Sequence, residues 1–262
     1  MQHELRMVDF LPDPQVALAV LPVRDLGEGL HRHEFAELAV VTEGQALHRT
    51  PFGDYPIRAG DIYFIPRGMA HGVRKVEGLA LINLLFDPGR LAFPFERLST
   101  IPGFHTLFTL RHQADGQGEF VNKLRLDQLG LSRVEGLLGK IRDELEERRD
   151  GYALAAENLA AGLLIELCRL KSAEGEGSNV CHFRIARALG KLEQHLSEPI
   201  DLERAAGFAG MSARSFQRYF LQATGSSFSN CLLGMRLRRA AALLRNGHLP
   251  IGDIALACGF PD

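Results

Sequence analysis

Three histidines and a glutamate lie in two short stretches of the N-terminal part of the sequence. His31, His33 and Glu37 come first, and His71 follows a turn at Pro66–Gly68. Positions 31, 33 and 37 differ by even numbers, so on an extended strand the three side chains project from one face. Three imidazoles and a carboxylate suit a divalent transition metal such as iron, manganese, nickel or zinc. All four residues are therefore candidate metal ligands.

The same four side chains could serve a ligand without a metal. Imidazole and carboxylate groups form hydrogen bonds with hydroxyl groups, so a pocket built from them would bind a small polar molecule. A third alternative is that they are inert core residues. We predict an effector pocket lined by His31, His33, Glu37 and His71, with a divalent transition metal as an optional cofactor and none required.

A second group of residues lies near the C-terminus. Ser212 is placed to cap a helix that carries two phenylalanines on one face and basic and amide side chains on another. Arginine donates two hydrogen bonds to guanine, glutamine pairs with adenine, and a serine hydroxyl suits a phosphate. The candidate DNA-binding residues are therefore Ser212, Arg214, Gln217 and Arg218.

The charge distribution favours a nucleic-acid partner for this part of the chain. The 262 residues have a formal net charge of −2. Residues 182 to 250 hold ten Lys and Arg against four Asp and Glu, whereas residues 1 to 181 hold twenty against twenty-six. A basic segment in a chain that is acidic elsewhere indicates that one half meets a polyanion.

The basic segment also begins an internal repeat with an offset of 49 residues. The shift superposes Leu202 on Ile251, Ala206 on Ala255, Gly210 on Gly259, and Met211 on Phe260. A helix, a glycine turn and a second helix form a helix-turn-helix, whose second helix enters the major groove of DNA. The sequence ends just after the glycine turn of the second copy, so the chain is expected to be a fragment whose second helix-turn-helix is truncated.

Different apolar patterns in the two halves predict different elements. Strands are expected in Val16–Leu21, Glu37–Val41, Asp61–Ile65 and Leu79–Phe86, which Gly, Pro and Asp turns separate. Short strands at this spacing indicate a barrel or jelly roll. Beyond residue 126 the apolar residues recur every three or four positions, which predicts helices. The polar, Gly-rich stretch from 172 to 179 indicates a linker.

The first of these helices has an apolar face for which two interpretations stay open. The face consists of Leu131, Val134, Leu138, Ile141 and Leu145. It either covers the barrel of its own chain or forms a dimerisation seam with a second copy.

Cysteine usage and hydropathy indicate where the protein works. Cys168, Cys181, Cys231 and Cys258 show no CxxC spacing, which predicts reduced thiols. No apolar run approaches the roughly eighteen residues of a membrane helix, and no secretory signal precedes the first strand. A cytoplasmic protein without a membrane partner is expected.

These motifs resemble those of the AraC/XylS family of bacterial transcription regulators. The pattern HxHxxxE…GxxxxxPxGxxH in the N-terminal half is similar to the cupin motif pair, although Lys75 stands where the second motif would end in Asn. The C-terminal likeness lies in Ala205–Phe220, Thr224–Gly225, Arg236–Arg245 and Ile251–Phe260. Within the family, the region around His31–Glu37 and Leu81–Phe86 is most similar to the L-rhamnose-responsive branch.

The resemblance implies a multi-domain α+β fold. Residues 1–172 would form a cupin-type β-barrel or jelly roll with two covering helices, 173–181 a linker, and 182–262 an all-α helix-turn-helix module. The implied function is a ligand-responsive regulator that binds double-stranded promoter DNA and works with RNA polymerase as a homodimer. Its effector would be L-rhamnose or another sugar. The alternative is a metal-dependent cupin enzyme, an oxygenase or isomerase, which would leave residues 182 to 262 without a role.

Overall fold

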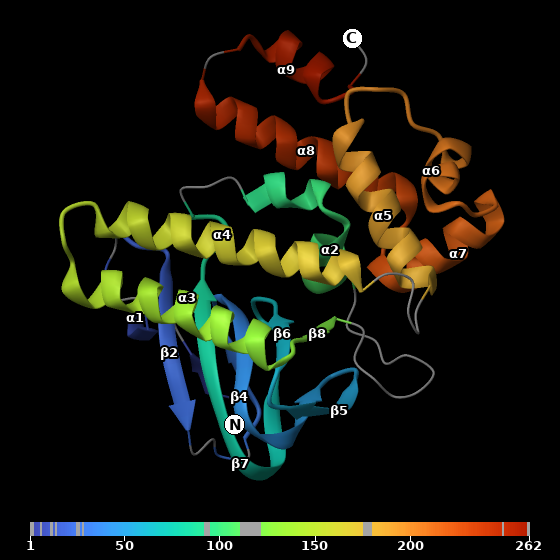
Figure 1. The fold of residues 1–262 in the computed structure, drawn as a ribbon. Coiled ribbons are helices and arrows are strands. Elements are labelled where there is room, and N and C mark those ends of the chain that lie inside the picture. Colours follow the sequence, from blue (N-terminus) through green and yellow to red (C-terminus); the bar gives the residue numbers. More distant parts are fainter. Residues whose placement is uncertain are drawn as a thin grey trace. The chain divides into compact units, whose positions relative to one another are not determined.

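The computed structural model divides the chain into two compact units (Figure 1). The first holds Met1–Leu98 and His112–Lys171, and the second holds Ser99–Arg111 and Ser172–Asp262. The structure describes all residues except 1, 2, 6, 11, 12, 14, 25, 26, 28, 92–94, 111–121, 175–179, 248, 261 and 262. Most of the predicted linker therefore lies outside the described residues. None of the described helices is long and apolar enough to cross a membrane.

The first unit is built on a sheet with antiparallel pairing. Its order is β2 (Leu18–Arg24), β7 (Gly72–Phe86), β4 (Ala36–Thr50), β6 (Asp61–Ile65) and β8 (Lys123–Arg125), and β5 (Gly53–Arg58) pairs with β4. A short parallel pair joins β1 (His3–Leu5) to β3 (His31–His33), and α1 (Met7–Phe10) lies between them in sequence. The four predicted strands are confirmed, and alternation within them produces the apolar core.

Strand β4 is much longer than the predicted Glu37–Val41, because it continues through Gly44. Gly44 has a φ of 70°, and the pairing of β4 with β7 shifts register on either side of it. A Cβ atom there would lie 2.3 Å from the backbone of Gly78. Only glycine fits this close approach, so the bulge lets one strand bend across the domain.

Helices α3 (Gln128–Glu147) and α4 (Tyr152–Ala173) follow the sheet and confirm the two predicted helices. The Asp127 carboxylate caps α3 by accepting from the Gly130 amide at 2.7 Å. Helix α3 packs on β2 and β7, and Val134, Leu138 and Ile141 are at most 1% exposed. Leu131 and Leu145 are half-buried. This burial within the unit favours the covering helix over the dimer seam for the three central residues.

The second unit is helical. It consists of α2 (Pro102–Phe104), the π-helix η2 (His105–Thr109), α5 (Val180–Gln194), α6 (Leu202–Ala209), α7 (Ala213–Thr224), α8 (Phe228–Asn246) and α9 (Ile251–Ala257). A 3-10 turn, η1 (Phe95–Thr100), leads into it. The buried core joins Ile185 and Leu189 of α5 to Phe216 and Phe220 of α7.

The predicted repeat is confirmed in the backbone. The Met211 amide donates to the Ala206 carbonyl at 3.0 Å, and the Phe260 amide donates to the Ala255 carbonyl, also at 3.0 Å. Gly210 and Gly259 follow their helices with φ angles of 63° and 78°. Because these four positions are related by the offset of 49 residues, both copies end their first helix with the same glycine turn.

Candidate functional site

Three of the four predicted ligands meet inside the first unit. The Nε2 atom of His33 lies 3.3 Å from Oε2 of Glu37 and 3.1 Å from Nε2 of His71. One donor atom from each of these residues lies within 4.8 Å of the others, and all three residues are buried. Two imidazoles and a carboxylate at this spacing form a three-donor cluster of the kind that holds a transition metal.

Backbone hydrogen bonds bring the two sequence motifs together. The amides of His31 and His71 each donate to the other's carbonyl, at 2.9 and 3.0 Å. The Gly68 amide, in the turn before His71, donates to the His33 carbonyl at 2.9 Å. Gly68 has a φ of 75°, which the Pro66–Gly68 turn requires. The local sequence thus positions His71 beside β3.

The hydrogen bond on the other side of His33 determines where its lone pair points. Nδ1 of His33 lies 2.6 Å from the carbonyl oxygen of Phe35 and must donate to it, because a carbonyl only accepts. In the neutral ring, Nε2 then presents a lone pair toward Glu37 Oε2, which is also an acceptor. Two acceptors at 3.3 Å need a proton or a cation between them, and a carbonyl behind the imidazole is the usual support of a metal ligand.

His31 lies beside this cluster rather than in it. Its ring centroid is 4.2 Å from that of His71, but its nitrogens are outside the three-donor group. Burial lowers the pKa of His31, and it lowers the pKa of His71 well below the usual value. Both rings are therefore neutral near pH 7, the form in which imidazole binds a metal or accepts a hydrogen bond.

A cavity of about 230 Å³ opens next to the cluster. Apolar side chains of β2 and β7, including Leu21, Leu81 and Leu85, form much of its wall. The polar residues that line it are His31, Glu37, Tyr63, His71 and Asn83. The predicted pocket role of His31, Glu37 and His71 therefore has a matching cavity, whereas His33 lies behind it.

Sequence reasoning missed Asn83 as a site residue. Asn83 is 9% exposed, lines the cavity, and its Oδ1 atom has no hydrogen-bond partner among the described residues. Leaving a buried acceptor unpaired costs about 1–3 kcal/mol, so such an atom needs an explanation. The signal was present in the sequence, since Asn83 interrupts the apolar run Leu79–Phe86.

His48 was also missed, because it lies beyond the predicted end of its strand. It is 1% exposed, and its ring centroid lies 4.5 Å from that of Tyr63 and 5.8 Å from that of His71. Burial raises the pKa of Tyr63, so its phenol stays protonated. His48 and Tyr63 extend the polar cluster into the barrel.

The predicted DNA-reading residues lie on the outer face of α7. Arg214, Gln217 and Arg218 are exposed, while Phe216 and Phe220 are buried against the unit's core. Ser212 is the N-cap of α7, and its hydroxyl accepts from the Ser215 amide at 3.4 Å. The guanidinium of Arg218 lies 4.7 Å from the ring centroid of Tyr219. The helix therefore presents three donor side chains to solvent on a packed support.

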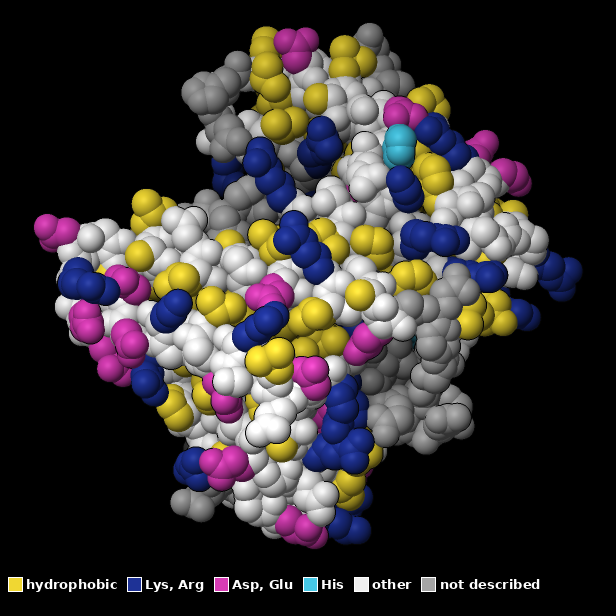
Figure 2. Space-filling model, viewed as in Figure 1, with side chains coloured by type: hydrophobic (Ala, Val, Ile, Leu, Met, Phe, Trp, Pro, Cys, Tyr) yellow, Lys and Arg dark blue, Asp and Glu magenta, His cyan; other side chains and the backbone are white. Residues whose placement is uncertain are grey.

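Among the arginines of α8, one forms hydrogen bonds within the unit and the others are exposed to solvent. Arg236 donates to the carbonyls of Leu196 and Glu198 at 3.2 and 3.0 Å, so it holds α8 to the turn after α5. Arg238, Arg239 and Arg245 are exposed. Figure 2 shows more Lys and Arg than Asp and Glu on the visible face of the helical unit, as the charge count of the sequence leads one to expect.

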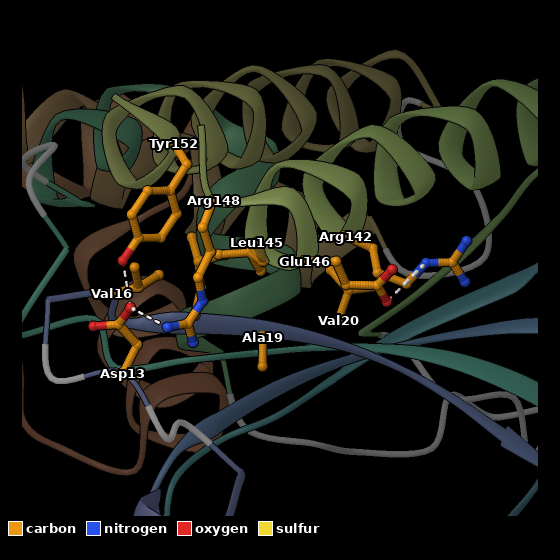
Figure 3. A pocket seen from close by; sticks show the side chains of 10 residues that line it. Asp13, Val16, Ala19, Val20, Arg142, Leu145, Glu146, Arg148 and Tyr152 are labelled. Carbon is orange, nitrogen blue, oxygen red and sulfur yellow. Dashed lines mark hydrogen bonds and ion pairs between the residues drawn. The ribbon is translucent and has the colours of Figure 1, made fainter. Parts of the chain in front are cut away.

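A second, smaller pocket lies where the segment before β2 meets the turn between α3 and α4 (Figure 3). It has a volume of about 160 Å³. The Tyr152 hydroxyl donates a short hydrogen bond to Asp13, and Nη1 of Arg148 lies 3.7 Å from Oδ2 of Asp13. Arg148 ends α3 with a φ of 51°. Across the pocket, Nε of Arg142 lies 3.7 Å from Oε1 of Glu146.

Comparison with known proteins identifies the class to which this fold and these sites belong. Residues 24–164 match the family model of the AraC-like ligand binding domain, and residues 205–262 match that of a helix-turn-helix domain. The chain belongs to the AraC family and is a ligand-responsive, DNA-binding transcription regulator. The predicted fold class, a cupin-type sheet domain joined to a helical helix-turn-helix region, is confirmed.

The relatives include the HTH-type transcriptional activator RhaR of Klebsiella pneumoniae, which is 30% identical over 98% of this chain and 89% of its own length. RhaR of Escherichia coli K12 is 28% identical over 100% of this chain and 90% of its own length. The chain is thus homologous to RhaR activators.

Solved structures resemble separate parts of the chain. A crystal structure of a transcriptional regulator of the AraC-type DNA-binding-domain class from Chromobacterium violaceum is 34% identical over 30% of this chain and 70% of that chain, with a TM-score of 0.29. An RmlC-like cupin from Shewanella frigidimarina is 25% identical over 27% of this chain and 66% of that chain, with a TM-score of 0.24.

Proposed function

We propose that the effector is a sugar, L-rhamnose or a related one, and that it binds in the cavity of the first unit. The observation that carries this proposal is a cavity lined by His31, Glu37 and His71, into whose wall Asn83 brings an oxygen with no partner among the described residues. Sugar hydroxyls both donate and accept, so they would pair with Glu37, with Asn83 and with the neutral imidazoles. Homology to RhaR activators supports a sugar.

A divalent metal in the same site is part of the proposal. His33, Glu37 and His71 would hold it, because their donor atoms already converge and the tautomer of His33 leaves Nε2 free to coordinate. The metal would act as a Lewis acid that orients effector hydroxyls. The regulator would not depend on it as a required cofactor.

Regulation follows from a difference in affinity. An effector shifts an equilibrium between two conformations only by the difference in its affinity for them. The sugar would favour the arrangement in which α7 presents Arg214, Gln217 and Arg218 to promoter DNA and in which RNA polymerase is recruited. Binding to promoter DNA would place the protein in the bacterial cytoplasm.

We also propose a homodimer. Leu129 of α3 and Leu154 of α4 are 64% and 62% exposed, so they offer apolar surface for a second copy. Val134, Leu138 and Ile141 are already buried in their own unit. Light scattering of the Leu129→Asp variant tests whether this apolar surface forms the dimer interface. A variant that remains dimeric would rule this interface out.

A thermal-shift screen tests the sugar proposal. L-rhamnose and other sugars are added to the 262-residue chain, and we expect at least one to raise Tm in the wild type and to do so much less in Glu37→Gln. Binding of that sugar should also change affinity for a promoter duplex. A sugar response that survives both Glu37→Gln and His71→Ala would place the effector elsewhere.

The converging donors also favour a second candidate function, a metal-dependent cupin oxygenase or isomerase. It would use His31, His33, Glu37 and His71 as ligands, although His31 lies outside the three-donor group. Turnover of sugar substrates by the metal-loaded protein separates the two functions. We expect sugar-dependent DNA binding without turnover, so that the protein is not an enzyme.

A further inference from the structure

One stretch of the sensing half of the sequence belongs structurally to the DNA-binding unit. Residues Ser99–Arg111 lie in sequence between β7 and β8 of the sheet domain, yet they group with α5 to α9. The chain therefore leaves the first unit after Leu98, returns to it at His112, and leaves it again after Lys171. We refer to Ser99–Arg111 as the inserted segment.

The inserted segment is part of the helical core rather than a surface loop. Leu110 is 2% exposed and belongs to the same buried cluster as Phe216 and Phe220 of α7. Phe104 and Leu107 are 7% and 1% exposed. Helix α2 and the π-helix η2 both pack on α5. Burying three large apolar side chains stabilises their placement by several kcal/mol in total, at about 1.5–3 kcal/mol for each.

The inserted segment lies close to α5, and hydrogen bonds within the segment and to Ser172 at the end of α4 support its conformation. A Cβ atom at Gly190 would lie 3.4 Å from the carbonyl oxygen of Thr100, so glycine lets the helix approach the segment's backbone. The Gly103 amide donates to Oγ of Ser172 at 2.9 Å. Nε2 of His105 donates to the Ser99 carbonyl at 2.7 Å, and the Leu110 amide closes the π-helix on the His105 carbonyl at 2.8 Å.

The strand before the inserted segment lines the effector cavity. Strand β7 contributes Leu81, Asn83 and Leu85 to the wall and ends at Phe86. Beyond Phe86 the same chain continues to Ser99 and into residues that contact α5 and share a core with α7. The predicted linker, residues 173–181, is therefore not the only stretch of chain that passes between the two units.

We propose that the inserted segment transmits the effector state to the reading helix by changing its packing on α5. This inference rests on the proposed effector site. A π-helix is rare and often marks functional positions, and η2 lies within the inserted segment. Coupling between the effector site and the DNA-binding unit is measured as the ratio of the DNA affinities with and without effector. In allosteric proteins this ratio is typically about 5- to 150-fold.

Gly190→Leu tests the proposal, because its side chain would occupy the position of the Ser99 and Thr100 carbonyls. The control is Lys191→Leu, at the adjacent exposed position of α5. Each variant of the 262-residue chain is measured with L-rhamnose as the probe and with a duplex selected by the wild type from a random pool. We expect Gly190→Leu to reduce the affinity ratio to below about twofold, with sugar affinity unchanged, and the control to keep the wild-type ratio.

Hydrogen exchange of the amides of residues 103–110 verifies that Gly190→Leu displaces the segment. If this variant does not fold, Leu110→Ala, which removes part of one buried side chain, replaces it. A displaced segment with a wild-type affinity ratio would overturn the transmission role and leave the effector site intact. A wild type whose DNA affinity does not respond to any sugar would instead overturn the proposed function itself.

Discussion

The Nε2 atoms of His33 and His71 lie 3.1 Å apart, inside hydrogen-bonding distance, although 38 residues separate them in sequence. Burial lowers the pKa of the His71 imidazole well below its usual value, so this ring is neutral near pH 7. The Glu37 carboxylate completes the group. Whatever occupies the middle of this cluster, a proton or a cation, determines the electrostatics of the cavity wall.

The cluster predicts a metal-binding stoichiometry. The wild type should bind about one Zn²⁺, Mn²⁺ or Ni²⁺ per chain, and His71→Ala should lose it, because two donors rarely hold such an ion. His31→Ala should keep most of the affinity, since His31 is outside the three-donor group. Metal analysis after dialysis measures this. Equal losses in the two variants would restore His31 as a ligand.

Asn83 should show a trade-off between stability and sensing. Asn83→Leu removes a buried oxygen that has no partner in the described part of the chain, at nearly constant volume, so the ligand-free protein should be as stable as the wild type or up to about 1–3 kcal/mol more stable. Sugar affinity should fall at least about tenfold if a hydroxyl pairs with Asn83. Urea unfolding and calorimetry measure the two effects. Ile82→Val, at the half-buried neighbouring position, is the control.

The exposed face of α7 should read bases. Arg214→Ala or Arg218→Ala should each cost about 1–3 kcal/mol on a selected duplex and relax preference at one base pair. Lys191→Ala on α5 serves as a matched loss of one exposed charge. Fluorescence anisotropy on selected and random duplexes gives both affinities. An equal loss on both duplexes would show that the arginines contact only phosphates.

The helical unit could be predicted from sequence because its signals are local. Period, N-caps such as Asp201 and Ser212, and αL glycines such as Gly210 each act within a few residues of the chain. The internal repeat adds a second test, because an element predicted in one copy must also be predicted in the other. Its backbone hydrogen bonds recur at the predicted offset because the same glycine turn must close both helices.

The parts that sequence did not reveal depend on contacts distant in the chain. Strand β4 continues past Gly44 through a bulge whose backbone lies against Gly78, and the continued strand carries His48 into the site. Asn83 becomes a site residue because β7 forms the wall of a cavity. No periodic pattern indicates that Leu110 joins the core of α5 and α7, since its partners lie more than seventy residues away.

Acid should destabilise the helical unit through His105. Burial lowers the pKa of His105 from 6.5 to about 4. Between pH 6.5 and pH 4, therefore, the histidine binds a proton in the unfolded chain but stays neutral in the folded unit. Stability is therefore intact above pH 6.5 and falls toward pH 4, by about 3 kcal/mol for this group. His105→Gln should show a shallower loss in urea unfolding. His182 has a lowered pKa for the same reason, so some acid dependence should persist.

Tyr152 should control the titration of Asp13. The hydrogen bond from Tyr152 is the largest cause of the lowered pKa of Asp13, and the charge of Arg148 is a smaller one. Tyr152→Phe should raise the pKa of Asp13 toward its ordinary value, and Arg148→Met should raise it less. Carbon-detected NMR titration reports both. The reverse order would make the ion pair the main contact at this pocket.

The chain passes between its two units three times, and this affects where it can be cut to express the two halves separately. A cut at residue 172 leaves Leu107 and Leu110 attached to the sensor half, where they would expose an apolar surface and promote aggregation. The complementary C-terminal piece would carry an open groove along α5 beside Gly190. Supplying residues 99–111 as a separate peptide should rescue that piece, so complementation rather than simple truncation is the way to study the halves.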